Sequence, residues 1–224
     1  MSRVFQFSSS ASLEKLTGKR AHTLEELLGL IRDCPGSSIF YHTFSAFLKM
    51  LEAKAPLNND FAVWVSESLN EKPLAEKLMA IDLAEFSTVE ALRERLIDII
   101  EAFREEKPNA FAKEGDEPFY LHDVTRFVYL TDKFAYDLKS FRELLPNISI
   151  YSLYFHFIES RLHTGLRTND FSVWFEGTLG MPELAEKIKN IDMHVYTLEG
   201  LRSRMMEIID ETSEKSGQGK EADR

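Results

Sequence analysis

The chain has 224 residues, of which 44% are hydrophobic and 29% are charged, and its formal net charge is −10. This composition excludes a disordered or fibrous protein, and the length allows one large domain or two of about 110 residues. The negative charge repels phosphate backbones and anionic lipids, so we expect no nucleic acid and no membrane among the partners.

The N-terminal residues lack the apolar stretch of a signal peptide, and no segment has the roughly 18 consecutive apolar residues that a transmembrane helix requires. The single cysteine, Cys34, has no second cysteine with which to form a disulfide in the chain. A lone cysteine is typical of proteins in a reducing compartment. We therefore expect a cytoplasmic protein.

The predicted elements begin with a brief strand and continue as helices. Apolar residues alternate at 5–7, which predicts the short strand. Thr23 and Glu26 have the spacing of a capping box before a first helix, and Ser87 and Glu90 repeat that spacing farther along the chain. Apolar residues recur at helical spacing after each of these signals, so we predict a helix after each.

The sequence then repeats itself. Several blocks recur in the same order with only small gaps: 16–24 at 130–138, 38–42 at 152–156, 59–64 at 169–174, 74–77 at 184–187, and 92–100 at 201–209. Collinear blocks of this kind indicate a tandem duplication of a unit of about 110 residues. We predict a first repeat at 1–106, a linker at 107–117, a second repeat at 118–212 and a disordered tail at 213–224.

The predicted fold is mainly α. Each copy is expected to form about four or five helices, with at most one short strand at its start, at 5–7 and at 119–121. The two copies are expected to pack about a pseudo-twofold axis, as related units commonly do.

A motif Asn-Asp-Phe-x-Val-Trp occurs once in each copy and has two interpretations. As a ligand or metal site, it supplies an amide and a carboxylate from Asn59 and Asp60, and again from Asn169 and Asp170. As a structural motif, its Asn or Asp side chain accepts backbone N–H groups at the start of a helix, and its Phe and Trp lie on the buried face of that helix. Capping accounts for every residue type in the motif, so we favour it and keep the four residues as ligand-binding candidates.

Two further pairs of repeated side chains are candidates for a ligand site. Trp64 and Trp174 could stack on a sugar or pack against a partner, although core packing is the favoured interpretation. His42 and His156 lie in an aromatic-rich helix, and His42 projects to the side opposite Phe40, among small polar residues. A structural histidine is favoured, yet the pair leads the site candidates because histidine titrates near neutral pH.

A weak metal site is suggested in the second copy alone. His156, Glu159 and His163 lie on one helical face, at a spacing that brings their side chains together. The first copy has Ser45 and Lys49 in place of Glu159 and His163, and no fourth ligand is evident. We therefore expect no metal and no other cofactor. No catalytic residue is assigned, because the common phosphate-binding and hydrolase motifs do not occur.

Six blocks carry a resemblance to a known family: 16–21, 38–43, 59–64, 150–156, 168–171 and 184–186. In their residues and order they resemble an uncharacterised bacterial family, the domain of unknown function numbered 5752. The resemblance implies a stand-alone bacterial cytoplasmic protein with no established activity, encoded near genes of glucan, trehalose or glycosyl-transfer metabolism. Members of the family carry a second histidine two residues after His42, where this chain has Phe44, and this departure weakens a paired-histidine site in the first copy.

Two functions remain open from the sequence. The first is a non-enzymatic binding or regulatory protein, linked to carbohydrate metabolism by the resemblance, with a small molecule or a protein as its partner. The alternative is an uncharacterised enzyme or metal-binding protein that uses the repeated histidines and Asn-Asp motifs at the groove between the copies. Histidines that share a pocket with the aspartates favour the alternative, whereas histidines tied to the backbone favour the first function. The oligomeric state is not predicted.

Overall fold

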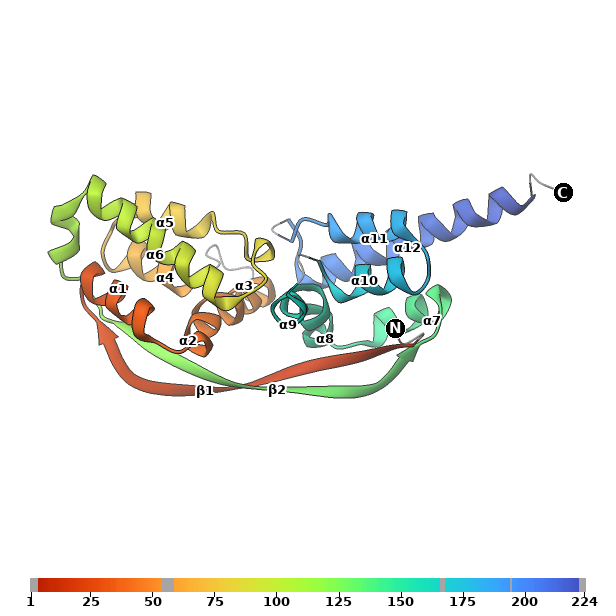
Figure 1. Ribbon diagram of the computed structural model, residues 1–224, viewed down its shortest axis with the longest axis horizontal. Helices are drawn as coiled ribbons and strands as arrows, with labels where there is room; N and C mark the ends of the chain where they lie inside the picture. Colours follow the sequence, from red (N-terminus) through yellow and green to blue (C-terminus); the bar gives the residue numbers. More distant parts are fainter. Residues whose placement is uncertain (1–3, 54–58, 166–167, 194, 222–224) are drawn as a thin grey trace. The chain divides into compact units, whose positions relative to one another are not determined.

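Two long strands overturn the expectation of a mainly α protein. In a computed structural model, which describes residues 4–53, 59–165, 168–193 and 195–221, β1 (Phe5–Ala21) and β2 (Phe119–Ala135) are each 17 residues long. They pair in a two-stranded antiparallel sheet (Figure 1). The protein is therefore α/β, and each predicted short strand is only the first part of a much longer one.

The chain divides into two units, and each strand contributes to both of them. The N-terminal unit comprises Ser12–Phe127, and the C-terminal unit comprises Met1–Ala11 and Val128–Arg224. The start of β1 thus lies in the unit that contains the second repeat, and the start of β2 lies in the unit that contains the first repeat. Each repeat donates its first strand segment to the other, so neither core is complete without the other half of the sequence.

Aromatic residues at the start of each strand fill the exchanged positions. In the C-terminal unit, the ring of Phe5 lies 5.5 Å from Phe171 and 5.5 Å from Trp174, measured between ring centroids. In the N-terminal unit, Phe119 lies 5.3 Å from Phe61, the residue that corresponds to Phe171. All of these rings are buried. Burial of an aromatic side chain is a large apolar contribution to folding, so the exchange of strands is part of each core.

The helices of the N-terminal unit follow the predicted order, with one correction at a helix start. Thr88 rather than Ser87 caps the last long helix, because its side chain accepts the N–H of Ala91 at 3.1 Å. The elements of this unit are α1 (Leu24–Asp33), α2 (Gly36–Phe40), a π-helical turn (Tyr41–Ser45), α3 (Ala46–Ala53), α4 (Asp60–Glu67), α5 (Lys72–Met79), a 3₁₀ turn (Leu83–Glu85), α6 (Val89–Glu106) and a second 3₁₀ turn (Pro108–Ala112).

The C-terminal unit repeats the order of the α-helices and the π-helical turn, which is the structural counterpart of the sequence duplication, whereas its 3₁₀ turn lies at a different place. Its elements are α7 (Leu138–Leu144), a 3₁₀ turn (Leu145–Asn147), α8 (Ile150–Tyr154), a π-helical turn (Phe155–Glu159), α9 (Ser160–Thr164), α10 (Asp170–Gly177), α11 (Pro182–Lys189) and α12 (Leu198–Glu221). Of the predicted tail, 213–221 continue α12, and 222–224 lie outside the described residues. The pseudo-twofold packing of the copies stays a prediction.

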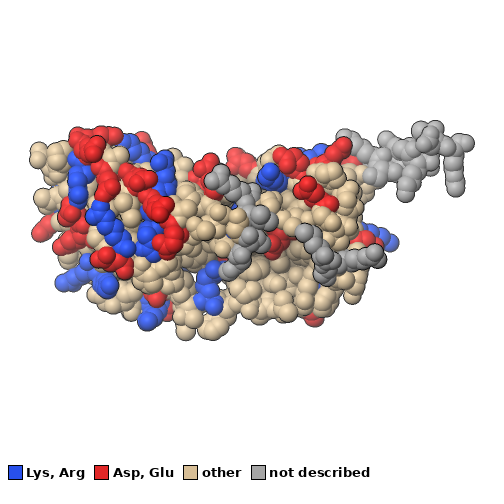
Figure 2. Space-filling view, in the orientation of Figure 1, with Lys and Arg blue, Asp and Glu red and all other residues tan. Residues whose placement is uncertain are grey.

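The charged side chains of the helices are interspersed. On the face shown in Figure 2, Lys and Arg side chains lie among Asp and Glu side chains over the helices of the N-terminal unit. One such pair joins α5 to α6, where Lys77 Nζ lies 2.7 Å from a carboxylate oxygen of Glu106. Among the residues that the structure describes, no helix is long and apolar enough to cross a membrane.

Candidate functional site

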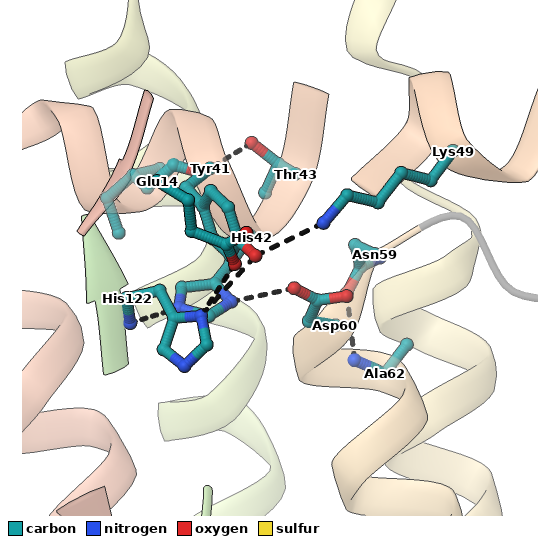
Figure 3. A network of polar contacts seen from close by, with 10 residues as sticks. Glu14, Tyr41, His42, Thr43, Lys49, Asn59, Asp60, Ala62 and His122 are labelled. Atoms are coloured by element: carbon teal, nitrogen blue, oxygen red, sulfur yellow. Dashed lines mark hydrogen bonds and ion pairs between the residues drawn. The ribbon is translucent and has the colours of Figure 1, made fainter. Parts of the chain in front are cut away.

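The repeated histidine of the first copy connects a helix to the exchanged strand. His42 lies on the π-helical turn after α2 and is only 3% exposed. Its Nδ1 lies 2.8 Å from Asp60 Oδ2, and its Nε2 accepts the backbone N–H of His122, on β2, at 2.9 Å (Figure 3). A backbone N–H can only donate, so Nε2 carries no proton and Nδ1–H donates to Asp60. Burial lowers the pKa of His42, although the hydrogen bond with Asp60 opposes this effect.

The second copy repeats the arrangement on β1. His156 Nδ1 lies 2.7 Å from Asp170 Oδ2, and Nε2 accepts the backbone N–H of Ser8 at 2.7 Å. The hydroxyl of Ser152 donates to the carbonyl oxygen of the same Ser8 at 2.6 Å, so both backbone polar groups of that strand residue are bound by side chains. We call each set, a histidine with its aspartate and the strand N–H that it binds, a histidine clamp.

The asparagines of the repeated motif cap the helices, as the structural interpretation predicts. Asn59 Oδ1 accepts the N–H of Ala62 at 2.8 Å at the start of α4, and Asn169 Oδ1 accepts the N–H of Ser172 at 2.8 Å at the start of α10. The aspartate that follows each asparagine is the first helical residue and faces the histidine. The two polar residues of the motif therefore have different roles: the asparagine caps the helix, and the aspartate orients the histidine of the clamp.

The two tryptophans pack in the cores beside the exchanged strands. Trp64 and Trp174 are each 6% exposed. Trp64 lies 5.9 Å from Phe119, between ring centroids, and its indole N–H donates to the carbonyl of Glu117 at 2.7 Å.

The clamps leave the repeated histidines without a nitrogen for proton transfer. A general base must reach the proton that it abstracts, at hydrogen-bond distance. Both nitrogens of His42 are engaged by Asp60 and by a backbone N–H, and the same is true of His156. In this conformation the histidines are positioning residues that hold the strands.

A second polar arrangement lies in the N-terminal unit beside the clamp. Lys49 Nζ donates to Tyr41 Oη at 3.1 Å, Tyr41 Oη lies 3.3 Å from His122 Nδ1, and His122 Nδ1 lies 2.9 Å from Glu14 Oε1 (Figure 3). We call these four residues the polar network. Three of them, Tyr41, Lys49 and His122, line a depression of about 390 Å³ whose other lining residues are His42, Asp60, Val63, Trp64, Glu67, Ser68, Pro118, Phe119 and Tyr120.

The duplication shows which of these residues the fold needs. Both units have the clamp, but the described side chains of the C-terminal unit form no counterpart of the polar network. At the positions of the network residues it has a different set: Val128 for Glu14, Phe155 for Tyr41, His163 for Lys49 and Ser8 for His122. The C-terminal unit forms the same order of α-helices and the same π-helical turn with those residues. The polar network is therefore not required by the fold, and its residues are the best candidates for function.

Comparison with known proteins places the chain in a family. The model of a family of unknown function, DUF5752, matches residues 2–210. The chain belongs to this family. The structure of OrfY from Thermoproteus tenax is similar to it, with 30% sequence identity, a TM-score of 0.78, and coverage of 93% of this chain and 94% of that one. No curated protein matches the sequence.

The resemblance inferred from the sequence is thus confirmed at the level of the DUF5752 family. Neither the family nor OrfY is described by an activity, so the site must be judged from its chemistry. The repeated blocks of the sequence do not point to the polar network, because the copies differ at all four of its positions. The signal in the sequence is at two of these positions, where a polar residue of one copy aligns with an apolar residue of the other: Glu14 with Val128, and Tyr41 with Phe155.

The weak metal candidate of this DUF5752 chain lies partly outside the described residues. No group of three or more His, Cys, Asp or Glu side chains within the described ranges could hold a metal ion. His156 is bound by its clamp, and Glu159 Oε2 accepts the hydroxyl of Ser10 at 3.2 Å. The side chain of His163 lies outside the described part of the structure.

Proposed function

We propose that this DUF5752 protein is a non-enzymatic binding or regulatory protein, and that it takes a small polar molecule in the depression of the N-terminal unit. The observation that carries the proposal is the presence of the polar network in the N-terminal unit alone, among the residues that the structure describes, at the edge of that depression. Holding the side chains of the polar network in one arrangement costs conformational entropy. A fold that does not need the network gains no stability in exchange. Ligand binding would supply a reason for its presence.

The clamps argue against the rival enzyme. That hypothesis needs His42 and His156 as acid or base groups supported by Asp60 and Asp170. Each histidine instead forms hydrogen bonds with its aspartate and with a backbone N–H of a strand. Holding the strand is a structural role that explains both residues. The same bonds occupy the nitrogens that a metal would use.

The cellular setting belongs to the proposal as well. A bacterial, cytoplasmic protein with a link to carbohydrate metabolism is what the family resemblance implies. The single cysteine, Cys34, is free and buried, which suits a reducing compartment. The bacterial origin, the cytoplasmic location and the link to carbohydrate metabolism stay predictions.

A thermal-shift screen of the full chain against sugars, nucleotides and divalent metals tests the proposal. A ligand that binds the folded state raises the melting temperature by mass action. The matched variants exchange one residue between the copies: Tyr41→Phe gives the N-terminal unit the residue of the C-terminal unit, and Phe155→Tyr does the reverse. We expect a ligand whose effect is lost in Tyr41→Phe and kept in Phe155→Tyr. A ligand that stabilises both variants as it does the wild type binds elsewhere and contradicts the proposal.

A further inference from the structure

We infer that His122 is the residue that selects the ligand of this depression, and that the ligand is a neutral molecule with hydroxyl groups. The inference rests on the proposed function and names the chemistry of the same site. It follows from where the protons of the polar network lie and from the charges around the depression.

The proton on His122 is placed by Glu14. An ionised carboxylate only accepts hydrogen bonds, so the contact of 2.9 Å between Glu14 Oε1 and His122 Nδ1 puts the proton on Nδ1. In the neutral ring the lone pair is then on Nε2, which points away from Glu14 and Tyr41 in Figure 3. No residue in the described part of the chain forms a hydrogen bond with this Nε2. The His122 side chain is 26% exposed, so Nε2 is an accessible acceptor.

Two further groups at the depression have hydrogen-bonding capacity to spare. Asp60 binds His42 through Oδ2, but its side chain is 41% exposed, and its second oxygen is an acceptor. Within the described ranges of the chain, Lys49 uses one of its three N–H groups on Tyr41 and has two left to donate. A ligand therefore meets two acceptors and one charged donor.

The charges select a neutral ligand. Asp60 and Glu67 line the depression with negative charge, which repels an anion such as phosphate. Lys49 also lines the depression, and its ammonium group, whose Nζ donates to Tyr41 Oη at 3.1 Å, repels the ammonium group of a cationic ligand. A hydroxyl group donates and accepts without carrying a charge. It can donate to His122 Nε2 or Asp60 while its oxygen accepts from Lys49.

The role of Glu14 gives the inference a spectroscopic signature. Glu14 is a positioning residue, because it acts through His122. In Glu14→Gln the amide can donate to Nδ1, which would move the proton to Nε2 and turn the acceptor into a donor. We expect the ¹⁵N chemical shifts of the His122 ring to report that exchange of tautomers. The C-terminal clamp, which has no glutamate at this position, should keep its signals.

Nuclear magnetic resonance titration of the ¹⁵N-labelled full chain tests the inference, with myo-inositol and inorganic phosphate as the probes. The matched variant is His122→Ser, because serine is the residue of the other copy and retains the backbone N–H that binds His42. We expect myo-inositol to shift the amide signals of Tyr41, Lys49 and Tyr120. The affinity should fall about tenfold in His122→Ser, since a buried or partly buried hydrogen bond is lost. Phosphate should shift none of these signals.

Each contrary result overturns a different statement. Equal affinity for myo-inositol in wild type and His122→Ser overturns the role of His122 in selecting the ligand. That result does not contradict the proposal that the depression binds a ligand. Shifts with phosphate in place of myo-inositol overturn the neutral class of ligand. If no compound of the thermal-shift screen shifts any signal at the depression, the proposed function itself is overturned.

Discussion

His42 holds the exchanged strand through the nitrogen that Asp60 leaves free. The aspartate takes the proton-bearing Nδ1 at 2.8 Å, and the opposite nitrogen accepts the N–H of His122 at 2.9 Å. The same relationship in the second copy links Asp170, His156 and Ser8. The repeated residues are therefore best explained by the exchange of strands between the repeats.

Removal of a clamp histidine should destabilise the chain. In His42→Ala, the N–H of His122 and the carboxylate of Asp60 lose their partner, and the ring contact with Phe119 is lost. We expect a loss of about 2–4 kcal/mol in the free energy of unfolding, from the unsatisfied donor and the cavity together. Urea denaturation measures it, and His22→Ala, at a histidine outside the clamps, is the control. A change in His42→Ala no larger than in the control would assign His42 to another role.

The stability of the fold should decrease as the pH is lowered, because His42 takes up a proton. Because burial lowers its pKa, with further lowering by His122 and Lys49, the folded chain takes up this proton at a lower pH than the unfolded chain, whose ordinary value is 6.5. The unfolded state then binds more protons, so the contribution is complete above about pH 6.5 and is lost as the pH falls through the lowered pKa. Melting temperatures between pH 7.5 and 5 measure it. His42→Gln keeps a donor and an acceptor but does not titrate, so an unchanged pH dependence in this variant would exclude His42 as the source.

The exchange of strands predicts that a change at the N-terminus loosens the C-terminal half of the sequence. Phe5→Ala removes a buried ring that packs on Phe171 and Trp174, and we expect a cost of about 3–5 kcal/mol. Amide hydrogen exchange should then lose protection in α10 and keep it in α4. Phe119→Ala, the matched variant, should have the reverse effect. Lost protection in α4 after Phe5→Ala would contradict the exchange.

The two helix caps should differ in strength. Asn59 donates a second hydrogen bond from Nδ2 to the carbonyl of Leu78 at 3.1 Å, whereas Nδ2 of Asn169 is buried with no hydrogen-bond partner among the described residues. Loss of a cap costs about 1 kcal/mol. We expect Asn59→Ala to cost more than Asn169→Ala by about 1 kcal/mol, the value of one more hydrogen bond. Chemical denaturation of both variants decides this, and an equal or reversed order would contradict it.

The sequence predicted the features that depend on local signals. The duplication, the helices and the Asn caps follow from repeated blocks, apolar spacing and short polar motifs. The strands did not follow, because their alternating pattern lasts only a few residues. Leu13 and Leu16 are largely exposed in β1, so their sequence does not look like a half-buried strand.

The site was harder to predict because the residues that contact one another in it are distant in the sequence. His42 and His122 are brought together by a strand from the second repeat, which no local pattern reveals. The helical projection that put His42 opposite Phe40 also assumed a regular α-helix. A π-helical turn over Tyr41–Ser45 changes the angle per residue, and both His42 and Phe40 are buried.

The protonation of the two clamp histidines tests the central claim most directly. Long-range ¹H–¹⁵N correlation spectra of the full chain near pH 7.5 distinguish the two neutral tautomers of a histidine ring. If the clamps hold the exchanged strands, His42 and His156 both carry their proton on Nδ1, with Nε2 unprotonated and hydrogen-bonded to a strand N–H. A proton on Nε2 of either ring, or rapid exchange between the tautomers, would contradict the account, because the strand N–H would then have no acceptor.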